Sequence, residues 1–432
     1  MTAEIVIMNS EAIAMASDSA VTMVTPKGEK IFTSANKLFA LSKYRPVGVM
    51  VYGRASFMQT PWETIIKVYR RHLGKKGFPL LEDYAKDFMN FLDDGNKLFP
   101  DVVQERFVSM MTRGYFDLIL RDIKDEYTTR IDDKGEISEK ELKKIIGDII
   151  SKHHDMCRKA PKDKNFGRGF SSRFKSKYLE IVKSAAKSVF QKVPLTKTRR
   201  NQLYHLAECL VSRSPQHFGE QEPSGLVFAG FGEKEVFPSV TAYIVLGIVD
   251  DKLKAKQFTS EKIDFNTSAS VMPFAQREMV DTFMAGVNPK YAELHQSYLM
   301  EAFSTYARMI VNNIEEYTDK EKEALFNKLT RTNQEILTEM KKKLDSYMLE
   351  AHIEPITSVV AMLPKDELAA MAESLVNLTS FKRKVTMESE TVGEPIDVAV
   401  ISKGDGFVWI KRKHYFPAEL NQQFFRNYQS EA

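Results

Sequence analysis

Thr2 is the first side chain of the sequence that could do chemistry. Removal of Met1, which methionine aminopeptidase carries out readily before a small residue, would leave Thr2 with a hydroxyl and a free α-amine. An α-amine has an unperturbed pKa of about 7.7–8.0, so it can accept the hydroxyl proton directly or through a water. The sequence therefore predicts an N-terminal threonine nucleophile, with Met1 absent from the active protein.

Asp18, Lys37 and Gly53 are of the residue types that such a nucleophile needs. A lysine beside the α-amine favours the deprotonated amine and helps to polarise the hydroxyl, and an aspartate holds that lysine charged and oriented. The backbone N–H of a glycine, unobstructed by a side chain, can donate to the oxyanion of a tetrahedral intermediate. The set predicts amide hydrolysis through an acyl-threonine ester.

Two predicted β-hairpins would position these residues. The first joins strands over 3–8 and 12–17, and its pairing places Thr2 opposite Ser17 and Asp18. The second joins strands over residues 37 to 42 and 47 to 52, and it places the lysine opposite the glycine. If the hairpins lie side by side, the nucleophile and its three helpers share one end of a sheet.

β-structure is predicted at the start, middle and end of the chain, with helical blocks between. The economical interpretation is one β-rich core that carries helical insertions. The predicted parts are a first part of the core (2–75), a helical insertion (76–221), a second part of the core (222–287), a helical segment (288–384) and the final core strands (385–432).

The segment from Cys157 to Arg200 is strongly basic, with fourteen Lys/Arg against two Asp/Glu in a chain of net charge +4. A helix over 170–190 has an apolar stripe, which predicts burial against neighbouring helices with the charges left in water. A docking surface for a protein partner and nucleic-acid binding are the alternatives, but no exposed aromatics are interleaved, so no specific nucleic-acid binding is expected. The stripe consists of Phe174, Tyr178, Ile181, Val182, Ala185 and Val189.

Composition and motifs indicate a cytoplasmic protein without membrane association or cofactor. The two cysteines give no disulfide framework, and no run approaches eighteen apolar residues. Residues 130–141 resemble a calcium loop, but Arg130 and Lys134 occupy ligand positions. The adjacent His153 and His154 diverge on a helix, which favours a surface cluster over a metal site. No phosphate-binding loop is present, so energy-driven unfolding of a substrate would need a separate ATP-dependent protein.

The residues around the nucleophile resemble those of a proteasome β-subunit, and equally those of the bacterial two-component proteasome-like peptidase. ASDSAVT (16–22) is similar to the family's aspartate strand, and NKLFALSKYRPVGVMVYGRAS (36–56) to its lysine strand, turn and glycine strand. The resemblance implies an α+β fold, a four-layer αββα N-terminal-nucleophile (Ntn) hydrolase sandwich with large helical insertions. It also implies Thr2 as nucleophile, Asp18 and Lys37 as its charge partners, and Gly53 as the oxyanion donor.

The resemblance extends to weaker positions. It implies Ser270 as a serine before a helix in the second half of the core, and Glu390, or alternatively Glu388, as a late acid. Here Val392 stands where the family usually has serine. An apolar pocket for the residue preceding the scissile bond would be lined by Val21, Val51 and Ala55.

Two alternatives stand beside peptide hydrolysis. One is a non-peptide amidase or acylase on the same fold, and the other is a catalytically silent scaffold whose helical insertion binds a partner. The resemblance implies a peptide or other amide as substrate, and it leaves open a homo-oligomer and a separate ATP-dependent unfoldase as partners.

Overall fold

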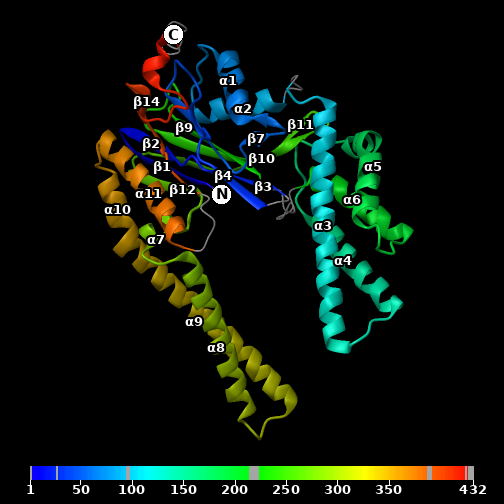
Figure 1. Cartoon of the computed structure of the whole chain (residues 1–432). Coiled ribbons are helices and arrows are strands. Elements are labelled where there is room, and N and C mark those ends of the chain that lie inside the picture. Colours follow the sequence, from blue (N-terminus) through cyan, green and yellow to red (C-terminus); the bar gives the residue numbers. More distant parts are fainter. Residues whose placement is uncertain are drawn as a thin grey trace.

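Figure 1 shows the computed structural model, in which two β-sheets form the centre of the molecule and helices surround them. The structure describes residues 2–25, 28–93, 98–213, 223–386, 392–423 and 426. Within these ranges the sheets are antiparallel throughout, and each has five strands.

The first sheet carries Thr2 at one end and has the strand order β12-β1-β2-β13-β14. It combines the N-terminal hairpin with the C-terminal one, and a strand from the middle of the chain adds to its edge. Its strands are β1 (Ala3–Asn9), β2 (Ala12–Ser17), β12 (Ala269–Ala275), β13 (Asp397–Ser402) and β14 (Gly406–Lys411).

The second sheet carries Lys37 and Gly53 beyond the ends of its strands and has the order β11-β10-β9-β6-β5. Its strands are β5 (Leu38–Ala40), β6 (Val47–Tyr52), β9 (Ser224–Gly230), β10 (Ser239–Val249) and β11 (Lys252–Lys262). Two small hairpins lie outside both sheets: β3 (Val21–Thr25) with β4 (Gly28–Phe32), and β7 (Ser56–Phe57) with β8 (Thr60–Pro61).

Apolar side chains from both sheets form the central core. Val6 and Met8 of β1 point to this interface and pack in one cluster with Met50 of β6 and Val227 of β9. Alternate residues of β1, such as Ile7, point instead to the outer helices. Because both faces of β1 are covered, its sequence is mostly apolar rather than alternating, with exceptions at Glu4 and at the last residue, Asn9.

Helices cover the outer face of each sheet, which makes four layers. α1 (Trp62–Leu73) and α2 (Leu81–Asp93) pack on the second sheet, where Phe88 contacts Phe228. The first sheet is covered by α7 (Glu278–Ala285), α10 (Glu354–Val360) and α11 (Lys365–Val385). The predicted four-layer αββα sandwich is thus confirmed. α2, which the sequence placed in the insertion, packs as part of the outer layer.

Four of the helices that lie in the sequence between β6 and β9 form a lobe with its own apolar core. The predicted stripe of α5 is confirmed: Phe174, Tyr178 and Val182 are buried, and Ile181 and Val189 pack against the same cluster. The lobe consists of α3 (Asp101–Lys134), α4 (Glu139–Lys159), α5 (Phe170–Val189) and α6 (Lys197–Ser212).

α8 (Pro289–Asn312) and α9 (Asp319–Met348) form an antiparallel pair that extends away from the sandwich (Figure 1). A π-helical turn (Leu349–Ile353) joins α9 to α10. Few residues of the pair are buried, and its surface includes large apolar side chains: Tyr291, Leu294, Tyr298, Met300, Tyr306, Met309, Ile336, Leu344 and Tyr347.

Helix ends follow the sequence signals at some positions and not at others. Thr318 with Glu321 forms a capping box at the start of α9. Thr60 and Glu63 have the same spacing but form no capping box, because Thr60 pairs with Phe57 in β8 and α1 begins two residues later. Among the described residues, no helix is both long and apolar enough to cross a membrane. A short 3₁₀ turn over Ala418–Leu420 lies near the C-terminus.

Candidate active site

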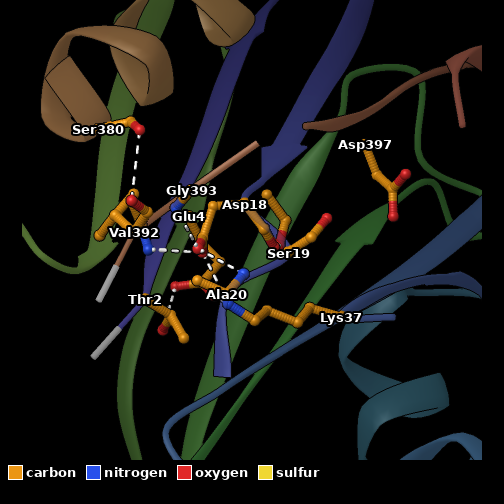
Figure 2. A network of polar contacts seen from close by, with 12 residues as sticks. Thr2, Glu4, Asp18, Ser19, Ala20, Lys37, Ser380, Val392, Gly393 and Asp397 are labelled. Atoms are coloured by element: carbon orange, nitrogen blue, oxygen red, sulfur yellow. Dashed lines mark hydrogen bonds and ion pairs between the residues drawn. The ribbon is translucent and has the colours of Figure 1, made fainter. Parts of the chain in front are cut away.

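Thr2 lies directly before β1 and is 3% exposed. Its carbonyl accepts a hydrogen bond from the Gln276 N–H at 3.1 Å, which holds the residue against the end of β12. Its hydroxyl donates to Glu4 Oε2 at 3.0 Å (Figure 2). The hydroxyl is therefore fixed in position and has a carboxyl oxygen as a neighbour.

Asp18 follows the last residue of β2 and is 1% exposed. Its carboxylate accepts three backbone N–H groups: Ala3 at 3.0 Å, Ala20 at 2.9 Å and Gly393 at 3.2 Å. Lys37 Nζ donates to the same carboxylate at 2.7 Å. Asp18 therefore ties together three chain segments and orients the lysine (Figure 2).

Lys37 reaches the site from the opposite sheet. It directly precedes β5, and its carbonyl accepts the Val51 N–H at 2.8 Å. Its ammonium lies 2.7 Å from Asp18 Oδ1 and 3.9 Å from Glu4 Oε1. All three side chains are at least nine-tenths buried, so the interaction of the ammonium with both carboxyl groups is little screened by solvent.

Glu4 is a site residue that sequence reasoning missed. Complete burial raises the pKa of this carboxyl to about 8, against the opposing effect of Lys37. Its Oε1 atom has no hydrogen-bond partner among the described residues. A single acid in a strand whose other residues up to Met8 are apolar, two positions after a candidate nucleophile, was the signal that could have identified it.

The segment just before β13 closes over Asp18. Besides the Gly393 N–H, it provides the Pro395 carbonyl, which accepts the Ser19 hydroxyl. The Val392 carbonyl accepts the Ser380 hydroxyl at 3.3 Å, which links the segment to α11 (Figure 2). Glu388 and Glu390, predicted as the late acid, lie outside the described residues.

A described acid, Asp397, lies at the start of β13 opposite Ser17 of β2. Its carboxylate accepts a hydrogen bond from the side-chain ammonium of Lys413 and another, at 2.9 Å, from the Lys413 backbone N–H. Burial lowers the pKa of Lys413 although Asp397 opposes that shift. The segment expected to contain the late acid thus borders the site. The acid that it places there is Asp397, which the sequence analysis did not single out.

The hairpin registers differ slightly from those predicted. Glu4 pairs with Ser17, which places Ala3 rather than Thr2 opposite Asp18. The hairpins also lie in different sheets and face each other across the core, instead of lying side by side in one sheet. Lys37 therefore reaches Asp18 by spanning the space between sheets.

Gly53 lies just beyond the end of β6 with φ of +81°. A Cβ atom at this position would lie 2.3 Å from the Pro223 carbonyl oxygen, so the backbone here requires glycine. Of the predicted pocket residues, Val51 packs in the core that α1 covers, Ala55 is exposed, and Val21 is half-buried at the start of β3.

Ser270 does not join this cluster. It pairs with Met8 of β1, near the far end of that strand from Thr2, and its hydroxyl donates to Glu261 Oε2 at 2.6 Å. The expectation that Ser270 lies beside the nucleophile is therefore wrong. The reason is that residues 269–275 form a strand along β1, whereas the sequence was interpreted as the approach to a helix.

The adjacent histidines of α4 have different partners. His153 contacts the Tyr115 hydroxyl at 3.2 Å and Asp122 at 2.8 Å, and His154 contacts His205 at 2.9 Å. The rings diverge as predicted, but His153 is buried, so the expected surface cluster is wrong. Over the described part of the chain, no group of three or more potential ligands is arranged to hold a metal ion.

The site thus offers a buried hydroxyl, two carboxyl groups and an ammonium at the edge of the space between two sheets. A hydroxyl can attack a carbonyl carbon when a neighbouring base takes its proton and a cation lowers the energy of the developing negative charge. The site has both kinds of neighbour: Glu4 contacts the hydroxyl, and the Lys37 ammonium lies beside Glu4.

No protein-family model and no curated protein matches the sequence. Among solved structures, the chain is similar to an Anbu (Gly-1) mutant from Hyphomicrobium sp. strain MC1, with 7% identity and a TM-score of 0.30. The comparison covers 100% of this chain and 97% of the other. A likeness of this size supports no inference about activity.

Proposed function

We propose that this protein is a threonine-type hydrolase that cleaves an amide bond, and that the bond is a peptide bond. The supporting observation is the buried cluster in which Lys37 Nζ lies 2.7 Å from Asp18 beside the Thr2–Glu4 hydrogen bond. Removing charges from water is costly, and apolar side chains of similar volume often stabilise a core better. A chemical role would account for the presence of an acid–lysine–acid set next to a buried hydroxyl.

In the proposed reaction, Thr2 Oγ1 attacks the substrate carbonyl carbon and gives its proton to a base. The base then protonates the leaving nitrogen as the C–N bond breaks, which leaves an acyl-threonine ester. Water attacks the ester, releases the acid and restores the hydroxyl. The Lys37 ammonium stabilises negative charge on Oγ1, and the Gly53 N–H is assigned to the oxyanion.

Two groups are candidates for the base. One is the α-amine of Thr2, which removal of Met1 would expose, and the other is Glu4, whose oxygen lies 3.0 Å from the hydroxyl. With a pKa of about 8, Glu4 holds its proton more tightly than an ordinary carboxyl and is a correspondingly stronger base once ionised. Variants of Glu4 and the mass of the N-terminus separate the two.

A threonine-directed epoxyketone or β-lactone probe tests the proposal directly. The probe should acylate or alkylate Thr2, identified by mass spectrometry of proteolytic fragments, and should leave Thr2→Ala unlabelled. Thr357→Ala, which changes a hydroxyl on α10, is the matched control and should label like the wild type. An unlabelled wild-type chain that retains Met1 would favour the catalytically silent scaffold.

Self-association is proposed in addition. The α8–α9 pair exposes large apolar side chains along its length, for example Tyr298 at 62% and Met309 at 59%, which is typical of a surface that another protein covers. Sedimentation velocity of the purified chain should show an oligomer. A chain that stays monomeric at tens of micromolar would contradict self-association without bearing on the reaction at Thr2.

A further inference from the structure

A cavity of about 320 Å³ lies between the loop that follows Gly53 and helix α3 of the helical lobe. The loop supplies Arg54 and Met58 to its wall, and the helix supplies Arg106 and Phe107. A second cavity of about 510 Å³ continues along the same helix and shares Arg54, Arg106 and Met110 with the first. The two form one groove, which is called the α3 groove below.

Positive charge dominates the α3 groove. Among the described residues that line it, Arg54, Arg106 and Arg113 are basic and one, Asp117, is acidic. Within the described part of the chain, none of the three arginines forms an ion pair, and Arg106 donates only to the neutral Gln59 side chain at 3.2 Å. Unneutralised guanidinium groups in a cleft attract anions, and each can bind a carboxylate through two parallel hydrogen bonds.

The floor of the groove is apolar. Val103, Phe107 and Leu246 line the enclosed part, and Met110 lies at the junction of the two cavities with 46% of its surface exposed. Arg106, Met110 and Arg113 are spaced by four and three residues, so they lie on one face of α3. Apolar surface between separated arginines suits a peptide with acidic side chains, because the methylene groups can contact the apolar surface while the carboxylates reach the arginines.

The α3 groove begins next to Gly53, the residue assigned above to the oxyanion. Arg54 directly follows Gly53, and Pro223, whose carbonyl approaches Gly53 closely, lines the same cavity. A peptide whose scissile carbonyl contacts the Gly53 N–H would continue past Arg54 along α3. The helical lobe would thus supply a recognition surface beyond the sandwich.

We propose that the α3 groove binds the acidic residues of a peptide substrate, within a few residues of the bond that is cleaved. That the bound peptide is a substrate rests on the proposed function, whereas binding itself does not require cleavage. Nucleic acid fits the groove less well, because the rings of Phe57 and Phe107 at its wall are buried and cannot stack with bases.

Fluorescence anisotropy tests the inference with the Thr2→Ala chain, which cannot turn the peptide over. A labelled peptide of alternating glutamate and alanine should bind at least about tenfold tighter than the same peptide with glutamine, and the difference should shrink at high salt. Arg106→Glu combined with Arg113→Glu should remove that preference. Both arginines are exposed, so the helix should remain folded, which circular dichroism would verify.

Lys183→Glu combined with Lys187→Glu on α5 is the matched control, because it changes the net charge equally at another exposed face. This control should keep the preference for the acidic peptide. Equal binding of both peptides, an equal loss in the control, or tighter binding of single-stranded DNA than of the acidic peptide would overturn the inference. Acidic-peptide binding by a chain whose Thr2 resists the probe would support the groove and refute the hydrolase.

Discussion

Lys37 and Asp18 form a buried ion pair of 2.7 Å that joins the two sheets of the sandwich. The Asp18 carboxylate would keep three hydrogen bonds even without the lysine, because three backbone N–H groups also donate to it. The lysine has no comparable set of alternative partners among the described residues, since its other acidic neighbour, Glu4, is 3.9 Å away. The pair is therefore asymmetric in its effect on stability.

The first prediction concerns this asymmetry. Lys37→Ala should lower the free energy of unfolding by about 1–3 kcal/mol, because the Asp18 carboxylate keeps its backbone donors. Asp18→Ala should lower it by more, about 3–5 kcal/mol, because it leaves a buried ammonium and three N–H groups without their acceptor. Denaturant titration of both variants measures the order. The reverse order would show that the lysine, rather than the aspartate, holds the segments together.

The second prediction concerns turnover of an amide substrate. Thr2→Ala should abolish it and Thr2→Ser should retain part of it, because serine keeps the attacking hydroxyl. Lys37→Ala should reduce turnover by about 10³-fold or more, since removing one of several groups that act together costs about as much as removing all of them. Initial rates with a fluorogenic peptide measure both effects. Wild-type rates in Lys37→Ala would contradict the role proposed for the ammonium.

The third prediction uses the raised pKa of Glu4. The folded chain holds the Glu4 proton up to about pH 8, whereas the unfolded chain releases it at the ordinary value of 4.5. Between these values the folded state binds more protons, so the stability due to this group falls as pH rises. Glu4→Gln removes that dependence. The free energy of unfolding of Glu4→Gln, relative to that of the wild type, should therefore increase from pH 5 to pH 8 by up to a few kcal/mol. Denaturant titrations at several pH values measure this difference.

Glu4→Gln also distinguishes the two candidate bases. The glutamine oxygen can still accept the hydrogen bond of Thr2 but cannot take its proton. If Glu4 is the base, turnover should fall at least about 100-fold. If the α-amine is the base, turnover should stay within a few-fold and intact mass should show Met1 removed. A retained Met1 with full turnover would exclude the α-amine.

The fourth prediction concerns Gly53. Gly53→Ala should destabilise the chain by more than about 1 kcal/mol, because φ is +81° and a Cβ would lie 2.3 Å from the Pro223 carbonyl oxygen. Gly404→Ala is the matched control, since no atom lies within 4 Å of its added Cβ. Thermal unfolding compares the two variants. Equal melting temperatures would show that the loop relaxes freely around the added methyl group.

The fifth prediction concerns α5. Replacing Lys175, Lys183 and Lys187 by glutamate should leave the midpoint of thermal unfolding nearly unchanged, because all three are exposed. Phe174→Ala on the same helix should cost about 3–5 kcal/mol, because Phe174 is 2% exposed in the core of the lobe. Thermal unfolding of the two variants measures the contrast.

The sequence by itself determined features that depend on near neighbours in the chain. The strands of both hairpins follow from short apolar runs around turns, as over residues 3–17, and the buried face of α5 follows from its helical period. The chemistry of their side chains and their positions relative to these strands indicated Thr2, Asp18 and Lys37 as a set. These signals are local, so a single sequence contains them.

Only the tertiary structure decided which of these parts meet. Burial of β1 on both faces raises the pKa of Glu4, and no local pattern indicates that two sheets and a helical layer exclude water from position 4. Ser270 lies away from the site because its segment pairs along β1, a choice made between strands more than 250 residues apart. Gly393 and Lys37 reach Asp18 from distant segments because packing of the whole sandwich, rather than spacing in the chain, fixes their positions.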